Sequence, residues 1–165
     1  MQLQLSWLKA NCSGKGTAFE VFLPAITREE AEATIAEETM VAGNEHVLFV
    51  DDEPMLVDIA KKMLESIGYQ VTTRTSPIEA LELFRLRPQA FDVVVTDLTM
   101  PQMTGDKLAK AIRGIRPDLP IILCTGFSAS LNDQKAAQAG IRPLLHKPIL
   151  KKDLAHALRK ALDDD

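Results

Sequence analysis

The sequence predicts a doubly wound α/β domain built on a parallel sheet, and three observations lead to this fold class. From His46 onward, short apolar segments alternate with amphipathic segments in regular steps. The apolar segments are continuous rather than alternating, as in strands that are covered on both faces. Charged residues follow several of these segments directly, which is where open α/β sheets place their chemistry. With 46% hydrophobic residues, the 165-residue chain can form one such core.

The expected strands and helices follow one another in five steps. Strands are expected at residues 47–50, 69–73, 93–97, 120–124 and 141–145. Helices are expected after each strand, at about residues 54–67, 77–86, 105–115, 129–139 and 150–161. Repeated strand–helix steps indicate a parallel sheet with helices on both faces.

The first of these helices has clear signals at both ends. Pro54 takes a favoured first helical position, and Gly68 ends the helix. Apolar residues recur every three or four positions and predict its buried face. They are Met55, Leu56, Ile59, Met63, Leu64 and Ile67.

The helix expected at residues 129–139 differs from the others in composition. Its apolar positions are mostly alanine. Because buried apolar area contributes about 25 cal/mol per Å², such a helix gains little from packing. We therefore expect it to be loosely held and able to move.

The residues before His46 do not follow this repeat. Alternating apolar residues at 3–7 and 17–23, with a glycine-containing turn at 13–16, predict a β-hairpin. Thr27 and Glu30 form a capping box that opens a helix in an acidic segment. The chain is therefore expected to comprise a hairpin in residues 1–26, a helical linker in 27–45 and the main domain in 46–163.

Charged and hydroxyl side chains collect at the carboxyl ends of the expected strands. Asp51 and Asp52 follow the first strand, Asp97 ends the third, Thr125 follows the fourth and Lys147 the fifth. A carboxylate can attack phosphorus if the developing negative charge is neutralised. Paired acids supply oxygen ligands for Mg²⁺, and a lysine pairs with phosphate oxygens as a compact charge. These residues together predict a site for a divalent cation and a phosphoryl group.

Four short motifs, in this order, resemble those of response-regulator receiver domains. They are residues 50–54 (Val-Asp-Asp-Glu-Pro), 96–101 (Thr-Asp-Leu-Thr-Met-Pro) with Gly105, 124–126 (Cys-Thr-Gly) and 146–148 (His-Lys-Pro). The resemblance covers about residues 46–162. It implies the flavodoxin-like strand order 2-1-3-4-5 and a cis peptide bond between Lys147 and Pro148.

The resemblance also implies a role for each matching residue of the site. Asp97 matches the phosphoacceptor, and Lys147 matches the lysine that pairs with the phosphoryl group. Asp52 matches a direct Mg²⁺ ligand, and Asp51 matches the acid that holds a metal-bound water. The Thr99 carbonyl matches a backbone ligand, so Asp51, Asp52, Asp97 and Thr99 form the implied metal site.

Two further positions concern the switch that the resemblance implies. Thr125 matches the hydroxyl that moves toward the phosphoryl group. Three residues before the lysine, the family usually has an aromatic ring, whereas this chain has Leu144. A leucine has no ring and no hydroxyl tip, so the usual coupling between hydroxyl and ring stays open here. Phosphorylation itself does not depend on it.

Residues 14–24 resemble the final glycine motif and last strand of a histidine-kinase ATPase domain. This suggests the C-terminal part of a hybrid sensor histidine kinase. The phosphorylatable histidine region and the nucleotide-binding boxes are missing, so we expect the chain to act as a phosphoacceptor without ATP-dependent activity of its own. The implied partners are a histidine kinase or a histidine phosphotransfer protein, and a downstream protein target. The apolar hairpin is expected either to dock on the main domain or to pair with a second copy, which would form a homodimer.

Two alternative functions stay open on the sequence alone. An aspartate-dependent metal phosphatase or hydrolase usually has a second aspartate two positions beyond the nucleophile, where this chain has Thr99. A pseudo-receiver would bind partners without phosphate, although the acidic set is complete. The formal net charge of −4 and the lack of a basic stripe argue against nucleic acid. No membrane segment and no signal peptide is recognisable, so the cytoplasm is expected.

Overall fold

The computed structural model describes residues 9–12, 17–20, 42–126 and 144–163. The chain divides into two compact units, Met1–Glu38 and Thr39–Asp165. In the first unit, strand β1 (Lys9–Cys12) pairs antiparallel with β2 (Thr17–Glu20). The sequence predicted the first strand of this hairpin at residues 3–7. In the structure, the first described strand of the hairpin lies later in the chain, at Lys9–Cys12. Residues 3–7 and the part of the predicted linker helix from 27 to 41 lie outside the described residues.

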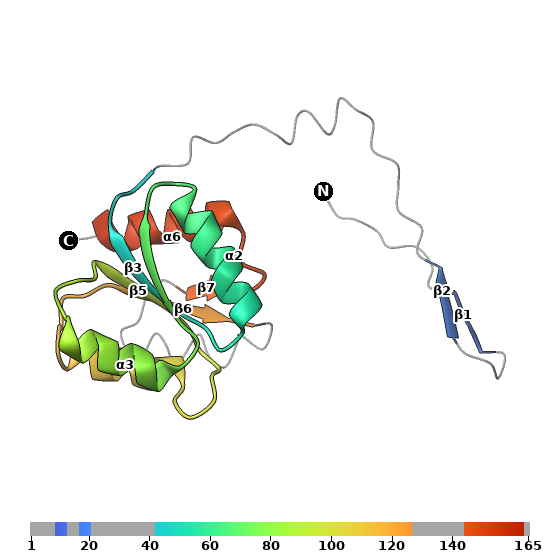
Figure 1. The fold of residues 1–165 in the computed structure, drawn as a ribbon. Coiled ribbons are helices and arrows are strands. Elements are labelled where there is room, and N and C mark those ends of the chain that lie inside the picture. Colours follow the sequence, from blue (N-terminus) through green and yellow to red (C-terminus); the bar gives the residue numbers. More distant parts are fainter. Residues whose placement is uncertain (1–8, 13–16, 21–41, 127–143, 164–165) are drawn as a thin grey trace. The chain divides into compact units, whose positions relative to one another are not determined.

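The second unit contains a five-stranded sheet in which every neighbouring pair of strands is parallel. Its strands, in chain order, are β3 (His46–Val50), β4 (Gln70–Arg74), β5 (Val93–Asp97), β6 (Ile121–Thr125) and β7 (Leu144–His146). Across the sheet they lie in the order β4-β3-β5-β6-β7 (Figure 1). Numbered along the chain, this is the order 2-1-3-4-5, so the predicted fold class is confirmed.

Helices cover both faces of this sheet. The described helices are α2 (Pro54–Glu65), α3 (Pro77–Leu86), α4 (Gly105–Arg113) and α6 (Lys151–Asp163). One core cluster joins α2 and α6 to the sheet, and a second cluster joins α3 and α4 to its other face. Successive residues of β3, Val47 to Val50, point alternately into the two clusters and are all buried. This explains the continuous apolar strands. The helix expected at residues 129–139 lies outside the described residues.

The buried face of helix α2 is only partly the predicted one: Leu64, and Ile67 just after the helix, are buried as expected, but the first turns differ. Met55 and Ile59 were expected to face the core, but they are 74% and 44% exposed. The buried residues of the helix are Val57, Ala60 and Leu64. The small side chain of Ala60 lets the helix pack closely on the sheet, which periodicity alone did not reveal. The predicted start is confirmed, since Pro54 is the first residue of the helix. The helix ends at Glu65, two residues earlier than predicted, and the turn that follows contains Gly68, whose φ of 97° favours glycine.

Residues 42–45, which the sequence assigned to the linker, belong to the second unit and have no regular secondary structure. The Gly43 amide donates to the Ile67 carbonyl at 3.1 Å. The Gln70 amide donates to the Glu45 carbonyl at 3.0 Å, and the Glu45 carboxylate pairs with Arg159 at 2.5 Å. The chain is therefore fastened to this unit before β3 begins.

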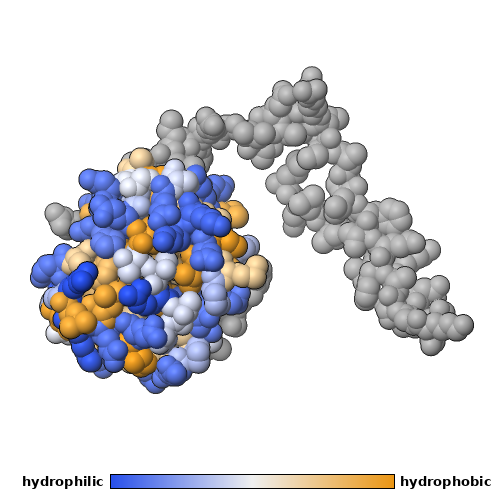
Figure 2. Space-filling model, in the orientation of Figure 1, coloured by the Kyte–Doolittle hydropathy of each residue, from blue (hydrophilic) through white to orange (hydrophobic). Residues whose placement is uncertain are grey.

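The surface of the second unit is mixed in character. Hydrophilic and hydrophobic residues interleave over the face shown in Figure 2. Leu86 and Met55 are the most exposed of its large apolar side chains, at 80% and 74%. Among the described residues, no helix is both long enough and apolar enough to cross a membrane.

Candidate functional site

Asp97 is the last residue of β5, the central strand of the sheet, and its side chain is buried. The Leu98 amide donates to the Cys124 carbonyl at 2.8 Å, so the sheet pairing continues one residue beyond Asp97. The chain then turns, and the Thr99 amide donates to Asp97 Oδ2 at 2.7 Å. The strand fixes the backbone of Asp97, and the turn fixes its carboxylate.

Asp51 and Lys147 lie at the same edge of the sheet as Asp97. Asp51 directly follows β3 and is 1% exposed. Its Oδ1 accepts from the Glu53 amide at 3.0 Å, and its Oδ2 accepts from Lys147 Nζ at 2.8 Å. The same Lys147 Nζ lies 2.6 Å from Asp97 Oδ1. One ammonium group therefore bridges two carboxylates that come from different strands.

The backbone around Lys147 places this ammonium group. Lys147 directly follows β7, and its amide donates to the Thr125 carbonyl at 2.8 Å. The peptide bond between Lys147 and Pro148 is cis, as the resemblance implied. The lysine is thus anchored to the neighbouring strand β6 at its backbone, while its side chain reaches across to Asp51 and Asp97.

Thr125 and Leu144 lie beside this cluster on β6 and β7. Thr125 is the last residue of β6 and is 3% exposed. Its hydroxyl donates to the Gly126 carbonyl at 3.4 Å, so it is not committed to the carboxylates. Leu144 pairs in register with Leu123 and packs, partly buried, against the core cluster of α3 and α4.

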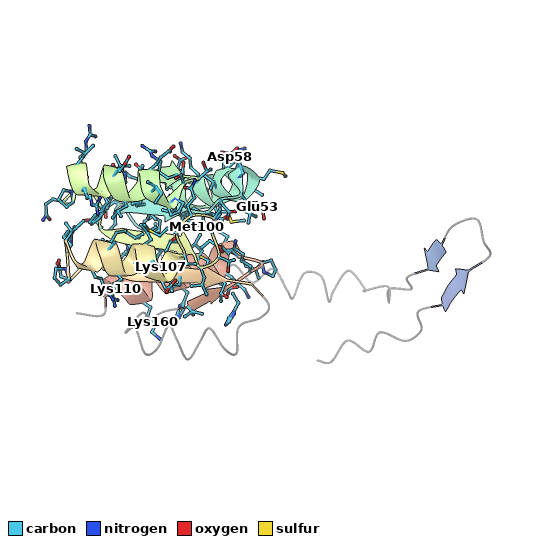
Figure 3. All side chains as sticks on the ribbon, turned by 90° about the horizontal axis from the view of Figure 1, so that it is seen from below. Glu53, Asp58, Met100, Lys107, Lys110 and Lys160 are labelled. Atoms are coloured by element: carbon cyan, nitrogen blue, oxygen red, sulfur yellow. The ribbon has the colours of Figure 1, made fainter. Side chains whose placement is uncertain are left out.

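Asp52 and the side chain of Thr99 are exposed, unlike the other predicted site residues. The structure brings Asp51, Asp97 and Lys147 together, but within residues 42–126 and 144–163 it shows no hydrogen bond or ion pair of the Asp52 carboxylate. The next residue in the chain, Glu53, which is labelled in Figure 3, donates its backbone amide to Asp51. Asp52 is therefore at the rim of the cluster rather than inside it.

Burial and ion pairing act in opposite directions on the two central groups. Burial raises the pKa of Asp97, and the hydrogen bonds from Lys147 and Thr99 offset this only in part. For Lys147, burial alone would lower the pKa, but the hydrogen bonds to Asp51 and Asp97 outweigh it and raise the pKa above its usual range. The lysine therefore stays charged, while the anionic form of Asp97 is held at a cost in stability.

The oxygen atoms of this cluster suit a hard cation such as Mg²⁺ in their chemistry. Each oxygen of Asp51 and Asp97 is used in one contact, and a carboxylate oxygen can accept more than one. No group of three or more acidic, histidine or cysteine side chains in the described part of the chain is arranged to hold a metal ion. Asp52 lies at the rim of the cluster, and the Lys147 ammonium group lies between the carboxylates of Asp51 and Asp97.

Glu53 and Gly105 both belong to the motifs quoted above, but the sequence did not show what either residue does in this site. The Glu53 amide orients Asp51, and the close approach of Gly105 to the Asp97 backbone fixes the turn after β5. The Glu53 contact carries no sequence signal, because any residue but proline has an amide. A glycine as the first residue of α4 was a usable signal, since glycine is a poor helix former and is kept where backbones must approach.

Comparison with known proteins agrees with this geometry. The family model of the response regulator receiver domain matches residues 47–159. The structure is similar to that of a response regulator receiver domain protein from Clostridium thermocellum, with a TM-score of 0.69, 32% identity, and coverage of 72% of this chain and 94% of the other. It is also similar to chemotaxis protein CheY4 from Vibrio cholerae, with a TM-score of 0.67, 30% identity, and coverage of 73% and 100%.

Two curated relatives are much longer than this chain. The two-component response regulator ARR11 of Arabidopsis thaliana is 39% identical over 122 residues, which cover 72% of this chain and 23% of that protein. The sensor kinase CckA of Brucella abortus is 30% identical over 159 residues, which cover 91% of this chain and 17% of that protein. The sheet order, the strand-end cluster and the family match over residues 47–159 agree. The chain belongs to the response regulator receiver domain family.

Proposed function

We propose that this receiver domain accepts a phosphoryl group from a phosphohistidine onto Asp97, in a reaction that requires Mg²⁺. The observation that carries the proposal is the position of Lys147 Nζ, 2.6 Å from Asp97 and 2.8 Å from Asp51. A cation beside a buried carboxylate is what a phosphoryl group needs on arrival, because its oxygens bring negative charge into a partly dry site.

In this reaction, an Asp97 oxygen forms a bond to phosphorus while the bond between phosphorus and the donor imidazole nitrogen breaks. The imidazole leaves with the electron pair and takes up a proton. Asp97 must be anionic to act as a nucleophile, and the Lys147 ammonium group favours the anionic form, against the effect of burial on the Asp97 pKa. Once the acyl phosphate has formed, the ammonium group of Lys147 pairs with a phosphoryl oxygen.

The cation site that we propose consists of the Asp51, Asp52 and Asp97 carboxylates and the Thr99 carbonyl. Receiver domains in general bind Mg²⁺ at their acidic pocket, and the bound ion neutralises charge on the phosphoryl oxygens. Asp51 is already held in place by the Glu53 amide. Asp52 is exposed at the rim and is free to turn inward.

The proposed signal begins at Thr125. Its hydroxyl holds only a 3.4 Å contact to the Gly126 carbonyl, so it can turn to donate to a phosphoryl oxygen. Leu144 lies on the neighbouring strand and packs against the α3 and α4 side of the core. We infer that a leucine rotamer change, rather than the movement of a ring, accompanies the switch toward a downstream protein.

The donor is a histidine kinase or a histidine phosphotransfer protein. The match to a sensor kinase over 91% of this chain supports the view that this receiver belongs to a hybrid kinase. The resemblance of residues 14–24 to the end of an ATPase domain points the same way. Dimer formation through the hairpin stays a prediction, which sedimentation of the full chain at increasing concentration would test.

A metal-dependent phosphatase is the weaker alternative. Its general acid would stand at Thr99, whose amide instead holds the Asp97 carboxylate. The family match does not favour it either. Slow turnover of small phosphomonoesters by the purified chain would support this alternative over ours.

The test is labelling with acetyl phosphate and Mg²⁺, followed by mass spectrometry of the acyl phosphate. We expect one phosphoryl group per chain, lost completely in Asp97→Asn and retained in Asp58→Asn. Asp58 is a matched control because it is an exposed aspartate on α2, labelled in Figure 3. Undiminished labelling of Asp97→Asn would contradict the proposal, as would labelling that does not depend on Mg²⁺.

A further inference from the structure

The turn after Asp97 is a closed loop that runs from Leu98 to Gly105. Its ends meet where the Gly105 amide donates to the Leu98 carbonyl at 3.0 Å. Gln102 at its tip has a positive φ of 68°. Met100, labelled in Figure 3, is 5% exposed and packs in the same core cluster as Leu108 of α4. The loop is thus held at its ends by the backbone and in its middle by a buried side chain.

Gly105 allows α4 to begin directly against the end of β5. A Cβ atom at this position would lie well inside van der Waals contact of the Asp97 carbonyl oxygen. It would also lie 3.0 Å from the Asp97 carbonyl carbon and 3.1 Å from the Leu98 Cα. All three neighbours are backbone atoms of the strand end, so no side chain can turn aside. To relieve the clash of a Cβ atom at position 105, the strand end or the helix would have to move by roughly 1 Å.

Such a movement would reach the reacting atoms directly. The Asp97 carbonyl, which Gly105 touches, belongs to the same residue as the nucleophilic carboxylate. The Thr99 amide on Asp97 Oδ2 is two residues further along, and Lys147 holds Asp97 Oδ1 at 2.6 Å. The carboxylate is therefore held from both sides in a position that depends on where the strand ends and the loop begins.

We propose that Gly105 and Met100 are positioning residues. They hold the loop so that the Asp97 carboxylate and the Thr99 carbonyl keep their positions relative to Lys147. This inference rests on the proposed function of Asp97. Gly105 does so by the close approach of backbones, and Met100 does so by anchoring the loop in the core. Neither residue touches the phosphoryl group.

The chain offers a matched glycine at the other end of the same helix. A Cβ at Gly114 would lie 3.3 Å from the Ala111 carbonyl oxygen and 3.6 Å from that of Lys110, which is tight but tolerable. Gly114→Ala therefore changes the same helix by the same methyl group without pressing on Asp97. Leu64→Ala, on the opposite face of the sheet, serves as a control for lost stability alone, because Leu64 is fully buried there.

The experiment compares Gly105→Ala with both controls in the full chain. Labelling by acetyl phosphate is measured over a range of donor concentrations at saturating Mg²⁺, and folding is checked by urea unfolding. A misplacement of about 1 Å can cost about 100-fold in rate, so we expect the maximal labelling rate of Gly105→Ala to fall by that order. The half-saturating donor concentration should change much less, and Gly114→Ala and Leu64→Ala should label within about threefold of the unaltered chain.

A second readout needs neither metal nor donor. The Thr99 amide donates to the Asp97 carboxylate, so the rate of hydrogen exchange at this amide reports whether that hydrogen bond is kept. Exchange at Thr99 should quicken in Gly105→Ala and stay unchanged in Gly114→Ala. If a folded Gly105→Ala variant labels as fast as Gly114→Ala and keeps its Thr99 protection, the proposal is wrong.

Met100→Ala keeps the test decisive if Gly105→Ala does not fold. It loosens the loop without a steric clash, and we expect slower labelling at an unchanged half-saturating concentration, with faster Thr99 exchange. Labelling equal to that of Leu64→Ala would overturn the proposal. If the unaltered chain is not labelled at Asp97 at all, the proposed function fails first, and the role of these two residues fails with it.

Discussion

Two ion-pair clusters lie at opposite edges of the same sheet, and they are built differently. At the carboxyl edge, Lys147 joins Asp51 and Asp97 through a single ammonium group. At the amino edge, Arg159 pairs with Glu45, donates its Nε to the Tyr69 hydroxyl at 2.8 Å and lies 5.3 Å from the centre of the Tyr69 ring. The first cluster uses a compact point charge, and the second uses a planar group with several simultaneous partners.

The carboxylates of the two clusters respond in opposite ways. Burial would raise the pKa of Glu45, but the hydrogen bond from Arg159 and those from backbone amides outweigh it, so the pKa is lowered. At Asp97 burial wins, and the pKa is raised. Ionisation of Glu45 in the amino-edge cluster therefore stabilises the fold. Ionisation of Asp97 in the carboxyl-edge cluster lowers the stability of the fold, because its carboxylate is buried. This difference separates a structural ion pair from one prepared for chemistry.

The largest expected effect is on phosphoryl transfer. Lys147→Ala should lower the labelling rate by at least about 100-fold, because it removes a preorganised charge beside the reacting oxygen. Arg159→Ala should leave the rate within about twofold, since its cluster lies at the other edge of the sheet. Labelling with acetyl phosphate checks both variants. Equal losses in the two variants would show that the clusters are not functionally distinct.

The second prediction concerns stability, where the two acids should differ in sign. Asp97→Asn should raise the free energy of unfolding by about 1 kcal/mol, because a buried anion is removed. Glu45→Gln should lower it by about 1 kcal/mol, because a charge-assisted contact is lost. Urea unfolding at neutral pH measures both. A loss of stability in Asp97→Asn would mean that the ion pair between Asp97 and Lys147 stabilises the fold by more than the burial of the carboxylate costs.

The third prediction uses the lowered pKa of Glu45. A lowered pKa in the folded state contributes stability that is fully present above the unfolded value, 4.5, and is lost as the pH falls through the folded value. The stability difference between the unaltered chain and Glu45→Gln should therefore be constant from pH 7 to about 5.5 and shrink below it. Unfolding curves between pH 7 and 3.5 provide the measurement. A difference that grows as the pH falls would reverse the sign of our assignment.

The smallest expected effect comes from Arg159→Lys. This variant keeps the charge but loses the fork geometry and part of the contact with the Tyr69 ring. We expect a loss of about 0.5 kcal/mol in the free energy of unfolding. Tyr69→Phe, which removes only the hydroxyl partner, is the matched comparison. Stability unchanged by Arg159→Lys would show that charge alone accounts for this cluster.

The sheet and the core of the site were predictable from sequence, because they follow from local patterns. Continuous apolar strands such as 93–95 require cover on both faces, and a parallel sheet brings all carboxyl ends to one edge. Asp51, Asp97 and Lys147 therefore had to meet. The exposure of Asp52 was not predictable, since it depends on which of two adjacent side chains turns inward at the end of β3.

Other features depend on contacts between distant segments. The Glu45–Arg159 pair forms only because α6 ends beside the start of β3, and no periodicity in residues 42–45 indicates it. The buried face of α2 was misjudged because Met55 and Ile59 fit the helical period as well as Val57 and Ala60 do. The sequence pattern defines a helix, but which side of it packs is decided by the sheet.

The attachment of residues 42–45 has a mechanical consequence. A pulling force applied ahead of Ala42 would first load the Gly43–Ile67 hydrogen bond and the Glu45–Arg159 pair. It would then act along β3, which is bonded on both sides by β4 and β5, so that its hydrogen bonds would bear the load together in shear. Asp97, on a strand that is not itself pulled, would keep its place until β3 slides out. A tether on that side therefore suits single-molecule measurements of this domain.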